Sequence, residues 1–241
     1  MPTYFKVRTS VIQALYKCMG SGISMHPFNQ WLVSRKVKKG STFPIIGCAI
    51  ALCILGQASF GQNVDERLIM KINPDATTPF VKPSRIVSDA MYAAAVVPAG
   101  MMIAGYVKHK SDLFNDGAAV GIASLTSFAI SSALKYSVRR SRPFAAQPLY
   151  VHDYRSPRKV GTAARYSFPS GHTAEVFALA TSLTLACPKW YVYTPAFAFA
   201  GTVAYSRMYL GVHYPTDVLM GAFIGTGSSL LVCAAKRRLQ R

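Results

Sequence analysis

The sequence predicts an all-α protein, an integral membrane helical bundle of about six transmembrane helices. Two observations predict this fold class. Hydrophobic residues make up 51% of the 241 residues and charged residues only 15%, and the apolar residues gather in long runs without Asp, Glu, Lys or Arg. A membrane-spanning helix needs about 20 mostly apolar residues, within a range of about 17–25. Strand patterns are weak along the whole chain.

Six runs lack all four charged residue types, and most of them reach spanning length. The run over 176–188 is marginal, and it extends back to His172 if Glu175 is tolerated. A soluble helical core is the alternative, but six such runs leave too little polar surface for one. The runs cover residues 40–64, 90–107, 117–134, 176–188, 190–206 and 218–235.

The first run has two interpretations, which stay open. A basic segment precedes an apolar stretch over 43–56 and the small-residue site Ala58-Ser59-Phe60-Gly61, which is the pattern of a cleaved signal peptide. A retained helix fits equally well, and Met25 could be the true start of the protein. Cleavage before Gln62 would leave five transmembrane helices instead of six.

The domain organisation follows from this first run. Residues 1–42 form a basic N-terminal segment that is partly untranslated if the protein starts at Met25, and 43–61 form the first helix or the apolar part of a signal peptide. Residues 62–241 form the helical bundle.

The net charge is +18, from 27 Lys and Arg against 9 Asp and Glu, and the positions of the basic residues predict the orientation of the helices in the membrane. Basic residues in the short loops mark the cytoplasmic side, and alternate crossings place 1–42, 108–110, Lys189 and 236–241 together there. The loop over 136–171 carries seven basic residues on the opposite side, against this rule, which indicates an anionic substrate. Because the basic residues are divided across the membrane, nucleic acid is not an expected partner.

Three polar clusters lie at the outer ends of predicted helices, where polar groups indicate function. They cover residues 135–143, 168–172 and 206–217. Each cluster alone has an ordinary explanation: a helix boundary, a local His–Asp pair, or cationic side chains at the lipid headgroups. Their shared position on one face makes a common site the better interpretation.

These residue types suit phosphoryl transfer. Lys and Arg neutralise the nonbridging phosphate oxygens, and a Ser-Gly-His helix start offers backbone N–H groups to an anion. An imidazole can attack phosphorus when a carboxylate fixes its tautomer, and His213 and Asp217 are four residues apart. The second imidazole, His172, can protonate the leaving oxygen.

With these residues the chain resembles the type 2 phosphatidic acid phosphatase superfamily, which consists of membrane lipid phosphate phosphatases. The family signature is Lys-x6-Arg-Pro, then Pro-Ser-Gly-His, then Ser-Arg-x5-His-x3-Asp. Here the three parts read Lys135 to Pro143, Pro169 to His172 and Ser206 to Asp217, and every signature position matches. The resemblance extends over residues 86–235.

The resemblance implies a role for each matching residue. His213 is the nucleophile and forms a phosphohistidine, and Asp217 holds the His213 side chain. His172 protonates the leaving group and then activates water. The phosphate-binding residues that it implies are Lys135, Arg142, Ser170, Gly171 and Arg207. It also implies that neither a metal nor another cofactor is needed.

The expected activity is hydrolysis of a lipid phosphomonoester or pyrophosphate at the periplasmic face of a bacterial inner membrane. Undecaprenyl pyrophosphate, phosphatidylglycerol phosphate, phosphatidate and lipid A all remain candidate substrates. The alternatives are a non-lipid acid phosphatase, a vanadate-dependent haloperoxidase and a non-enzymatic anion or lipid transporter. The sequence does not indicate the oligomeric state.

Two features of the predicted helices lie outside the signature. Glu175 could tune His172 or line the pocket, or it could be a carboxylate favoured by the helix start. Gly221 and Gly225 form a small-residue face, which we expect to pack within the bundle.

Overall fold

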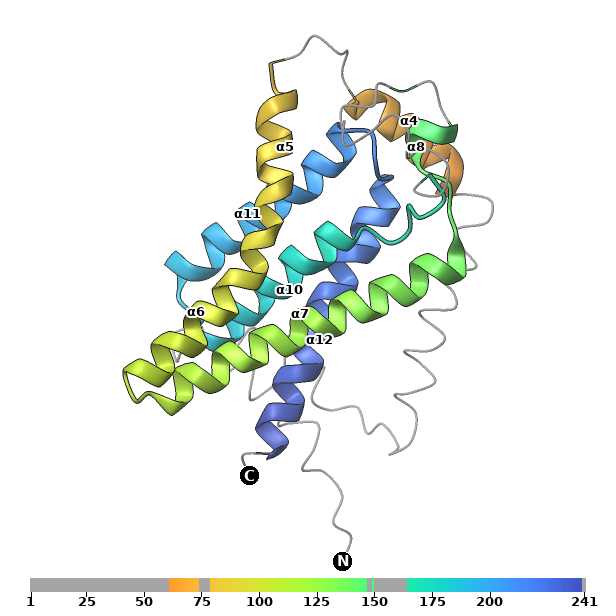
Figure 1. Ribbon diagram of the computed structural model, residues 1–241. Helices are drawn as coiled ribbons and strands as arrows, with labels where there is room; N and C mark the ends of the chain where they lie inside the picture. The colour runs from red at the N-terminus through yellow and green to blue at the C-terminus, as the bar shows by residue number, and fades with distance from the viewer. Residues whose placement is uncertain (1–60, 74–78, 147–148, 150–163, 240–241) are drawn as a thin grey trace, which may run out of the picture. The chain divides into compact units, whose positions relative to one another are not determined.

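The structure is a computed structural model that describes residues 61–73, 79–146, 149 and 164–239. All regular secondary structure in these residues is helical, which confirms the predicted fold class (Figure 1). The basic segment 1–42 and the first apolar run up to residue 60 lie outside the described residues. The domain boundaries proposed there stay predictions.

The other five apolar runs all fall in helical segments, and two short helices precede them. The run over 90–107 becomes a 3-10 turn followed by α6, and the remaining four become α7, α10, α11 and α12. The helices are α4 (Gly61–Ile72), α5 (Val81–Asp89), η2 (Ala90–Tyr92), α6 (Ala93–Val107), α7 (Ser111–Val138), α8 (Pro143–Ala146), α10 (Gly171–Ala186), α11 (Trp190–Tyr209) and α12 (Pro215–Leu239).

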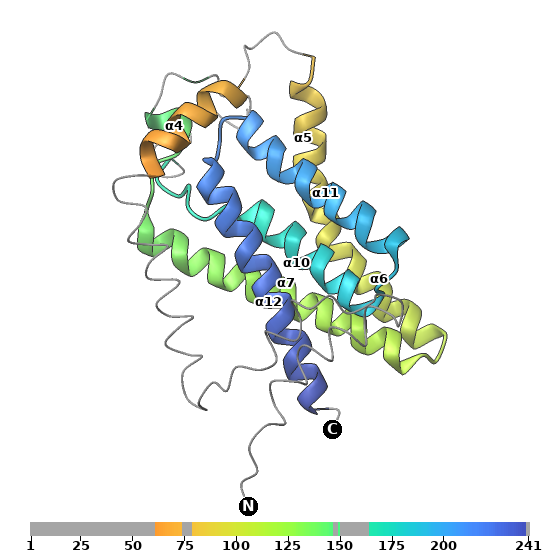
Figure 2. The same ribbon diagram turned by 180° about the vertical axis from the view of Figure 1, so that it is seen from behind.

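Helix α10 lies at the centre of the bundle. It packs against α7, α11 and α12, while α6 covers α7 and α5 packs on α11 (Figures 1 and 2). Its buried residues are small or branched, and Val176 and Ala180 pack with Ala200 and Val203 of α11. The run over 176–188 is the shortest of the six because Glu175 and Lys189 bound it.

The bundle carries its large apolar side chains outside and its small polar ones inside. Leu125 on α7 is 70% exposed and Phe223 on α12 is 63% exposed. By contrast, Ser127 on α7 is 0% exposed and Ser228 on α12 is 1% exposed. Lipid is as apolar as leucine, so helices in a membrane associate through small and polar residues instead of large apolar ones. This distribution fits a surface that faces lipid.

Among the residues that the structure describes, two helical segments are long and apolar enough to cross a membrane. These are the segment Ser111–Ala146, which contains α7, and helix α12, and the bent pair Val81–Tyr92 and Ala95–Val107 would make a third. Helix α10, with 16 residues, is short for a span. The predicted number of about six spans therefore stays a prediction.

The small-residue face of α12 packs against α10. A Cβ atom added to Gly221 would lie 2.5 Å from the carbonyl oxygen of Ser170, and one added to Gly225 would lie 2.1 Å from that of Ala174. Real Cβ atoms do not approach so closely. The two glycines thus let the backbones of α10 and α12 touch, inside the bundle as the sequence predicts.

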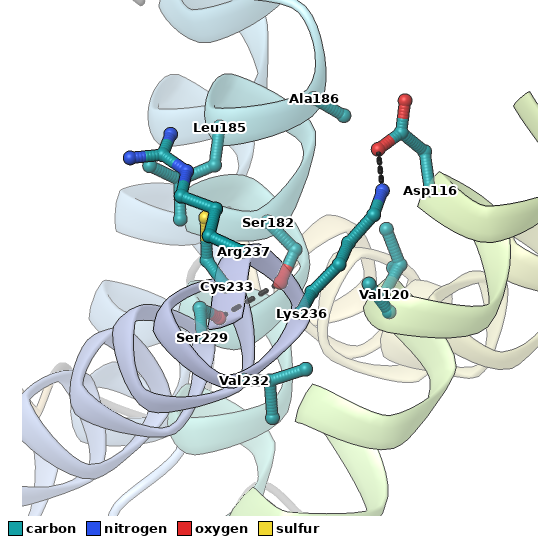
Figure 3. A pocket seen from close by; sticks show the side chains of 11 residues that line it. Asp116, Val120, Ser182, Leu185, Ala186, Ser229, Val232, Cys233, Lys236 and Arg237 are labelled. Atoms are coloured by element: carbon teal, nitrogen blue, oxygen red, sulfur yellow. Dashed lines mark hydrogen bonds and ion pairs between the residues drawn. The ribbon is translucent and has the colours of Figure 1, made fainter. Parts of the chain in front are cut away.

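One end of the bundle gathers the start of α7 and the ends of α10 and α12. Lys236 Nζ donates to Asp116 Oδ1 at 2.6 Å and links α12 to α7. A cavity of about 130 Å³ lies between the three helices, beside a hydrogen bond between Ser182 and Ser229 (Figure 3). Asp116 and Lys135 lie about 28 Å apart along α7, at 1.5 Å per residue, so this cavity is far from the polar clusters of the signature.

Candidate active site

The other end of the bundle brings together all the site residues that the sequence predicts. The ends of α7 and α11 meet the starts of α10 and α12 there, on the side of α4 and α8 (Figures 1 and 2). Lys135 lies in the last turn of α7, Arg142 just before α8, Ser170, Gly171 and His172 at the start of α10, Arg207 in the last turn of α11, His213 in the turn before α12, and Asp217 in the first turn of α12.

Backbone and hydroxyl groups hold two of the three cations in place. Lys135 Nζ donates to the carbonyl oxygens of Pro169 at 2.6 Å and Tyr166 at 3.2 Å, and its Cε would lie 3.7 Å from a Cβ atom added to Gly171. Arg207 is buried and donates from Nη1 to the Ser88 hydroxyl of α5. The Lys135 ammonium therefore lies directly beside the start of α10, where the backbone N–H groups of a helix favour an anion.

The two histidines share one electrostatic environment. His172 interacts electrostatically with His213 and with Lys135, Arg142 and Arg207. His213 interacts with the same three cations. Five side chains from the three polar clusters therefore lie close together, although the clusters are far apart in the sequence.

Asp217 is fully buried and faces His213. Its Oδ2 atom accepts hydrogen bonds from the Ser167 hydroxyl and from the backbone N–H of Tyr214, the latter at 2.9 Å. His213 Nδ1 lies 3.7 Å from the same oxygen, which is beyond hydrogen-bond length. Such contacts are often long before substrate binds and shorten in the complex. The carboxylate thus faces Nδ1 of His213 without a hydrogen bond to it.

The start of α10 is tied to the start of α12. The backbone N–H of Ser170 donates to the carbonyl oxygen of Asp217 at 2.9 Å. Ser170 is buried, and its hydroxyl accepts a hydrogen bond from Thr173 at 2.9 Å. This link fixes the distance between the helix start that carries His172 and the turn that carries His213.

Burial and the neighbouring cations Arg142, Lys135 and Arg207 hold the pKa of His213 well below its ordinary value of 6.5, although the backbone of Ser167 acts in the opposite direction. An imidazole without a proton on Nε2 is the form that can attack phosphorus. The surroundings therefore favour the neutral imidazole of His213.

This lowered pKa predicts a loss of stability in acid that depends on His213. Below about pH 6.5 the unfolded chain takes up a proton on this histidine and the folded chain does not, so the free energy of unfolding falls by about 1.4 kcal/mol per pH unit. We expect the midpoint of thermal unfolding to fall more steeply between about pH 7 and pH 5 in the wild type than in His213→Gln. Equal pH dependence in both proteins would mean that folded His213 keeps its ordinary pKa.

Sequence reasoning did not identify Asp65 and Arg140 as parts of the site. Arg140 belongs to a basic run that also fits contact with lipid headgroups, and Asp65 is one acidic residue in a stretch of balanced charge. In the structure Arg140 donates to Asp217 Oδ1 and to Asp65 Oδ2, both at 2.7 Å. The presence of two carboxylates around one guanidinium is visible only after folding.

Glu175 lies one residue beyond the first turn of α10, which contains no acidic residue. The helix-dipole explanation applies mainly within that turn. Its Oε1 atom is buried and has no hydrogen-bond partner among the residues that the structure describes. Its role stays open.

The comparisons with known proteins identify the family of this fold and site. The sequence pattern of the PAP2 superfamily matches residues 116–241, just over half of the chain. The chain is 37% identical over 117 residues to an undecaprenyl-diphosphatase of Sulfolobus acidocaldarius, covering 46% of this chain and 53% of that protein. It is 35% identical over 114 residues to a lipid A 1-phosphatase of Rhizobium etli, covering 45% of each chain.

Solved structures give the same fold. LpxE of Aquifex aeolicus is 25% identical, with a TM-score of 0.54, over 69% of this chain and 92% of that one. The first transmembrane PAP2-type phosphatidylglycerolphosphate phosphatase from Bacillus subtilis is 23% identical, with a TM-score of 0.59, over 79% of this chain and 94% of that one. The second likeness, at this identity, shows the fold alone, and that fold is a transmembrane helical bundle, as predicted.

The matches to the curated relatives span about half of those proteins' own length. They therefore establish the family without transferring a particular substrate. From the signature residues gathered at one end of a transmembrane helical bundle, and from the match over residues 116–241, it follows that this chain belongs to the PAP2 superfamily.

Proposed function

We propose that this protein is a membrane phosphatase that hydrolyses a phosphomonoester or pyrophosphate of a lipid through a phosphohistidine intermediate on His213. The observation that supports it most is the meeting of two imidazoles with Lys135, Arg142 and Arg207 at the start of α10. A dianionic phosphate needs such a cluster of cations, and an imidazole nucleophile and an imidazole acid then suffice for the transfer.

In the first half of the reaction, His213 Nε2 attacks phosphorus. The bond between phosphorus and the leaving oxygen breaks as the bond between phosphorus and nitrogen forms, and His172 gives its proton to the leaving oxygen. The three cations, with the Ser170 hydroxyl and the Gly171 amide, bind the nonbridging oxygens as charge develops on them. Asp217 stabilises the positive charge that His213 acquires.

In the second half, His172 acts as a base. It takes a proton from a water molecule, which attacks phosphorus while the bond to His213 breaks. Inorganic phosphate leaves, and both histidines return to their starting states. No metal ion takes part in this proposal, since the cations supply the charge neutralisation, so a chelator such as EDTA is expected to leave the rate unchanged.

The proposed substrate is a lipid with its phosphate at the membrane surface. Two of the curated relatives are named for phosphatase activity on polyprenyl-linked phosphates, an undecaprenyl-diphosphatase and a decaprenylphosphoryl-5-phosphoribose phosphatase of Mycolicibacterium smegmatis. An active site at the ends of α7, α10, α11 and α12 would let the lipid chain stay beside the bundle while the phosphate reaches the cations. We place it at the periplasmic face of a bacterial inner membrane, because the basic C-terminal end of α12 lies at the opposite end of the bundle.

A substrate panel with purified protein in detergent tests the activity. The panel contains undecaprenyl pyrophosphate, phosphatidylglycerol phosphate, phosphatidate, lipid A and the non-lipid ester p-nitrophenyl phosphate. We expect phosphate release from at least one lipid with a kcat/KM at least about 100-fold above that for the non-lipid ester, since remote binding energy of the lipid is used at the reacting centre. A phosphoenzyme trapped during turnover should be labile in acid and stable in alkali, as phosphohistidine is.

Each alternative has its own outcome in this experiment. Equal kcat/KM for the non-lipid ester would indicate an acid phosphatase of broad range, and bromide oxidation with vanadate would indicate a haloperoxidase. Binding of a lipid phosphate without release of phosphate would indicate a transporter. Any of these results would contradict the proposal.

A further inference from the structure

We propose that Arg140 and Asp65 form a positioning pair, which holds Asp217 in the orientation that His213 needs and makes helix α4 a required part of the active site. The inference rests on the proposed function, in which Asp217 supports the nucleophile. It adds two residues that are not fixed positions of the signature. Arg140 is one of the six variable residues between Lys135 and Arg142, and Asp65 precedes the residues 116–241 that match the family pattern.

The contacts of the Arg140 guanidinium leave it little freedom. Nη1 donates to Asp217 Oδ1 at 2.7 Å and to the Thr216 hydroxyl at 2.8 Å, and Nη2 donates to Asp65 Oδ2 at 2.7 Å. The flat face of the group lies 4.1 Å from the centre of the Tyr214 ring. A planar guanidinium whose two terminal nitrogens both donate hydrogen bonds, and which lies over an aromatic ring, is held far more firmly than a lysine ammonium would be.

Arg140 engages the oxygen of Asp217 that does not face His213. Oδ1 accepts from Arg140, while Oδ2 accepts from Ser167 and Tyr214 and faces His213 Nδ1. Both carboxylate oxygens are therefore fixed by donors from three different segments. Without Arg140 the carboxylate would keep only its two donors on Oδ2, and rotation about its Cβ–Cγ bond would no longer be opposed at Oδ1.

Asp65 anchors the pair from α4. It is only 1% exposed, and its Oδ1 accepts from the backbone N–H of Thr216 at 3.1 Å, while the Thr216 hydroxyl donates to Oδ2. A carboxylate that accepts from a first-turn N–H acts as a cap on the helix start. Asp65 thus binds α12 and Arg140 at once, at the point where α12 begins.

Charge explains why a second carboxylate is useful. Arg140 lies two residues before Arg142, one of the cations that bind the phosphate in the proposed reaction. With Asp217 alone as its partner, Arg140 could turn toward a bound phosphate and leave Asp217. Asp65 accepts from the other terminal nitrogen of the guanidinium. In this proposal Arg140 therefore holds Asp217 and does not bind the phosphate.

The test compares Arg140→Met, Arg140→Lys, Asp65→Asn and the double variant Arg140→Met/Asp65→Asn. We expect kcat to fall about 100-fold in Arg140→Met, because a misplacement of about 1 Å has effects of that size, with KM within about twofold of the wild type because Arg140 does not touch substrate. Arg140→Lys should recover only part of the loss. Asp65→Asn, which weakens one of the two anchors of Arg140 but leaves Asp217 as a partner, should have a smaller effect on kcat.

The double variant separates positioning from stability. Arg140→Met leaves Asp65 buried without its cation, which lowers the midpoint of thermal unfolding, and removing the Asp65 charge as well should restore part of that midpoint. The kcat of the double variant should stay low, since Asp217 Oδ1 still lacks its donor. Lys236→Met is the matched control: it breaks the ion pair with Asp116 at the far end of the bundle and should leave kcat unchanged.

The outcomes distinguish this inference from the proposed function. If the wild type releases phosphate and the double variant keeps kcat within about threefold of it, Arg140 and Asp65 do not position Asp217. The same conclusion follows if kcat recovers in step with the midpoint of unfolding, or if Arg140→Met raises KM with kcat unchanged. If the wild type itself releases no phosphate from any lipid, the proposed function has failed instead.

Discussion

Replacing His213 by alanine is expected to lower the rate of phosphate release by at least about 10⁴-fold, because the step that forms the phosphoenzyme has lost its nucleophile. No labelled phosphoenzyme should be trapped from this variant. His213 is buried, so the truncation leaves a small cavity, and the more conservative His213→Gln should show the same loss of activity with less loss of stability. The measurements are phosphate release, phosphoenzyme trapping and the midpoint of thermal unfolding.

His109→Ala is the control for this change. His109 lies in the exposed turn between α6 and α7, at the other end of the bundle. Its removal should leave phosphate release unchanged. If His213→Ala and His213→Gln both fold and release phosphate at the wild-type rate, the phosphohistidine mechanism is wrong.

Replacing Gly225 by alanine is expected to destabilise the bundle by about 3 kcal/mol or more, at the upper end of the cost of overpacking. The added Cβ would lie 2.1 Å from the Ala174 carbonyl oxygen and 2.7 Å from the backbone nitrogen of Ala178. Backbone atoms cannot move aside as a flexible side chain can, so α12 would have to shift away from α10. We expect a lower midpoint of thermal unfolding in detergent, with lower activity because Ser170 and Asp217 are linked across the same helix pair.

Gly227→Ala is the matched control on the same helix. A Cβ atom at Gly227 has nothing within 4 Å, and alanine favours a helix over glycine by about 1 kcal/mol. This variant should unfold at the wild-type temperature or higher. Equal midpoints for Gly225→Ala and Gly227→Ala would contradict the close packing of α12 on α10.

Local patterns in the sequence predicted the long helices of the described part of the chain and the packing face of α12, but not the short helices α4, α5 and α8, which lie in segments expected to be loops. A run without charged residues, such as 218–235, predicts a helix by its length and hydropathy alone, and α12 covers it. The spacing of Gly221 and Gly225 predicted a close contact within the bundle, which lies against α10. Both predictions depend on neighbours in sequence, so no knowledge of the tertiary fold was needed.

The apolar run in α10 is the shortest of the six because charged residues bound it, Glu175 before it and Lys189 after it. The helix itself is no less apolar than its neighbours α7, α11 and α12, as expected for a helix that is covered on several sides. Its end residues, including the His172 imidazole, belong to the polar site and interrupt the apolar pattern further.

By itself the sequence determined that the chain is helical and that its signature residues, from Lys135 to Asp217, suit a phosphate. Residue type and spacing carry that information directly. Only the tertiary structure decided what Asp65 and Arg140 do, because they are 75 residues apart and each alone looks like an ordinary surface charge. The two residues form a pair because Asp65 is buried. A carboxylate excluded from solvent requires a partner for its charge, and the fold places Arg140 between Asp65 and Asp217.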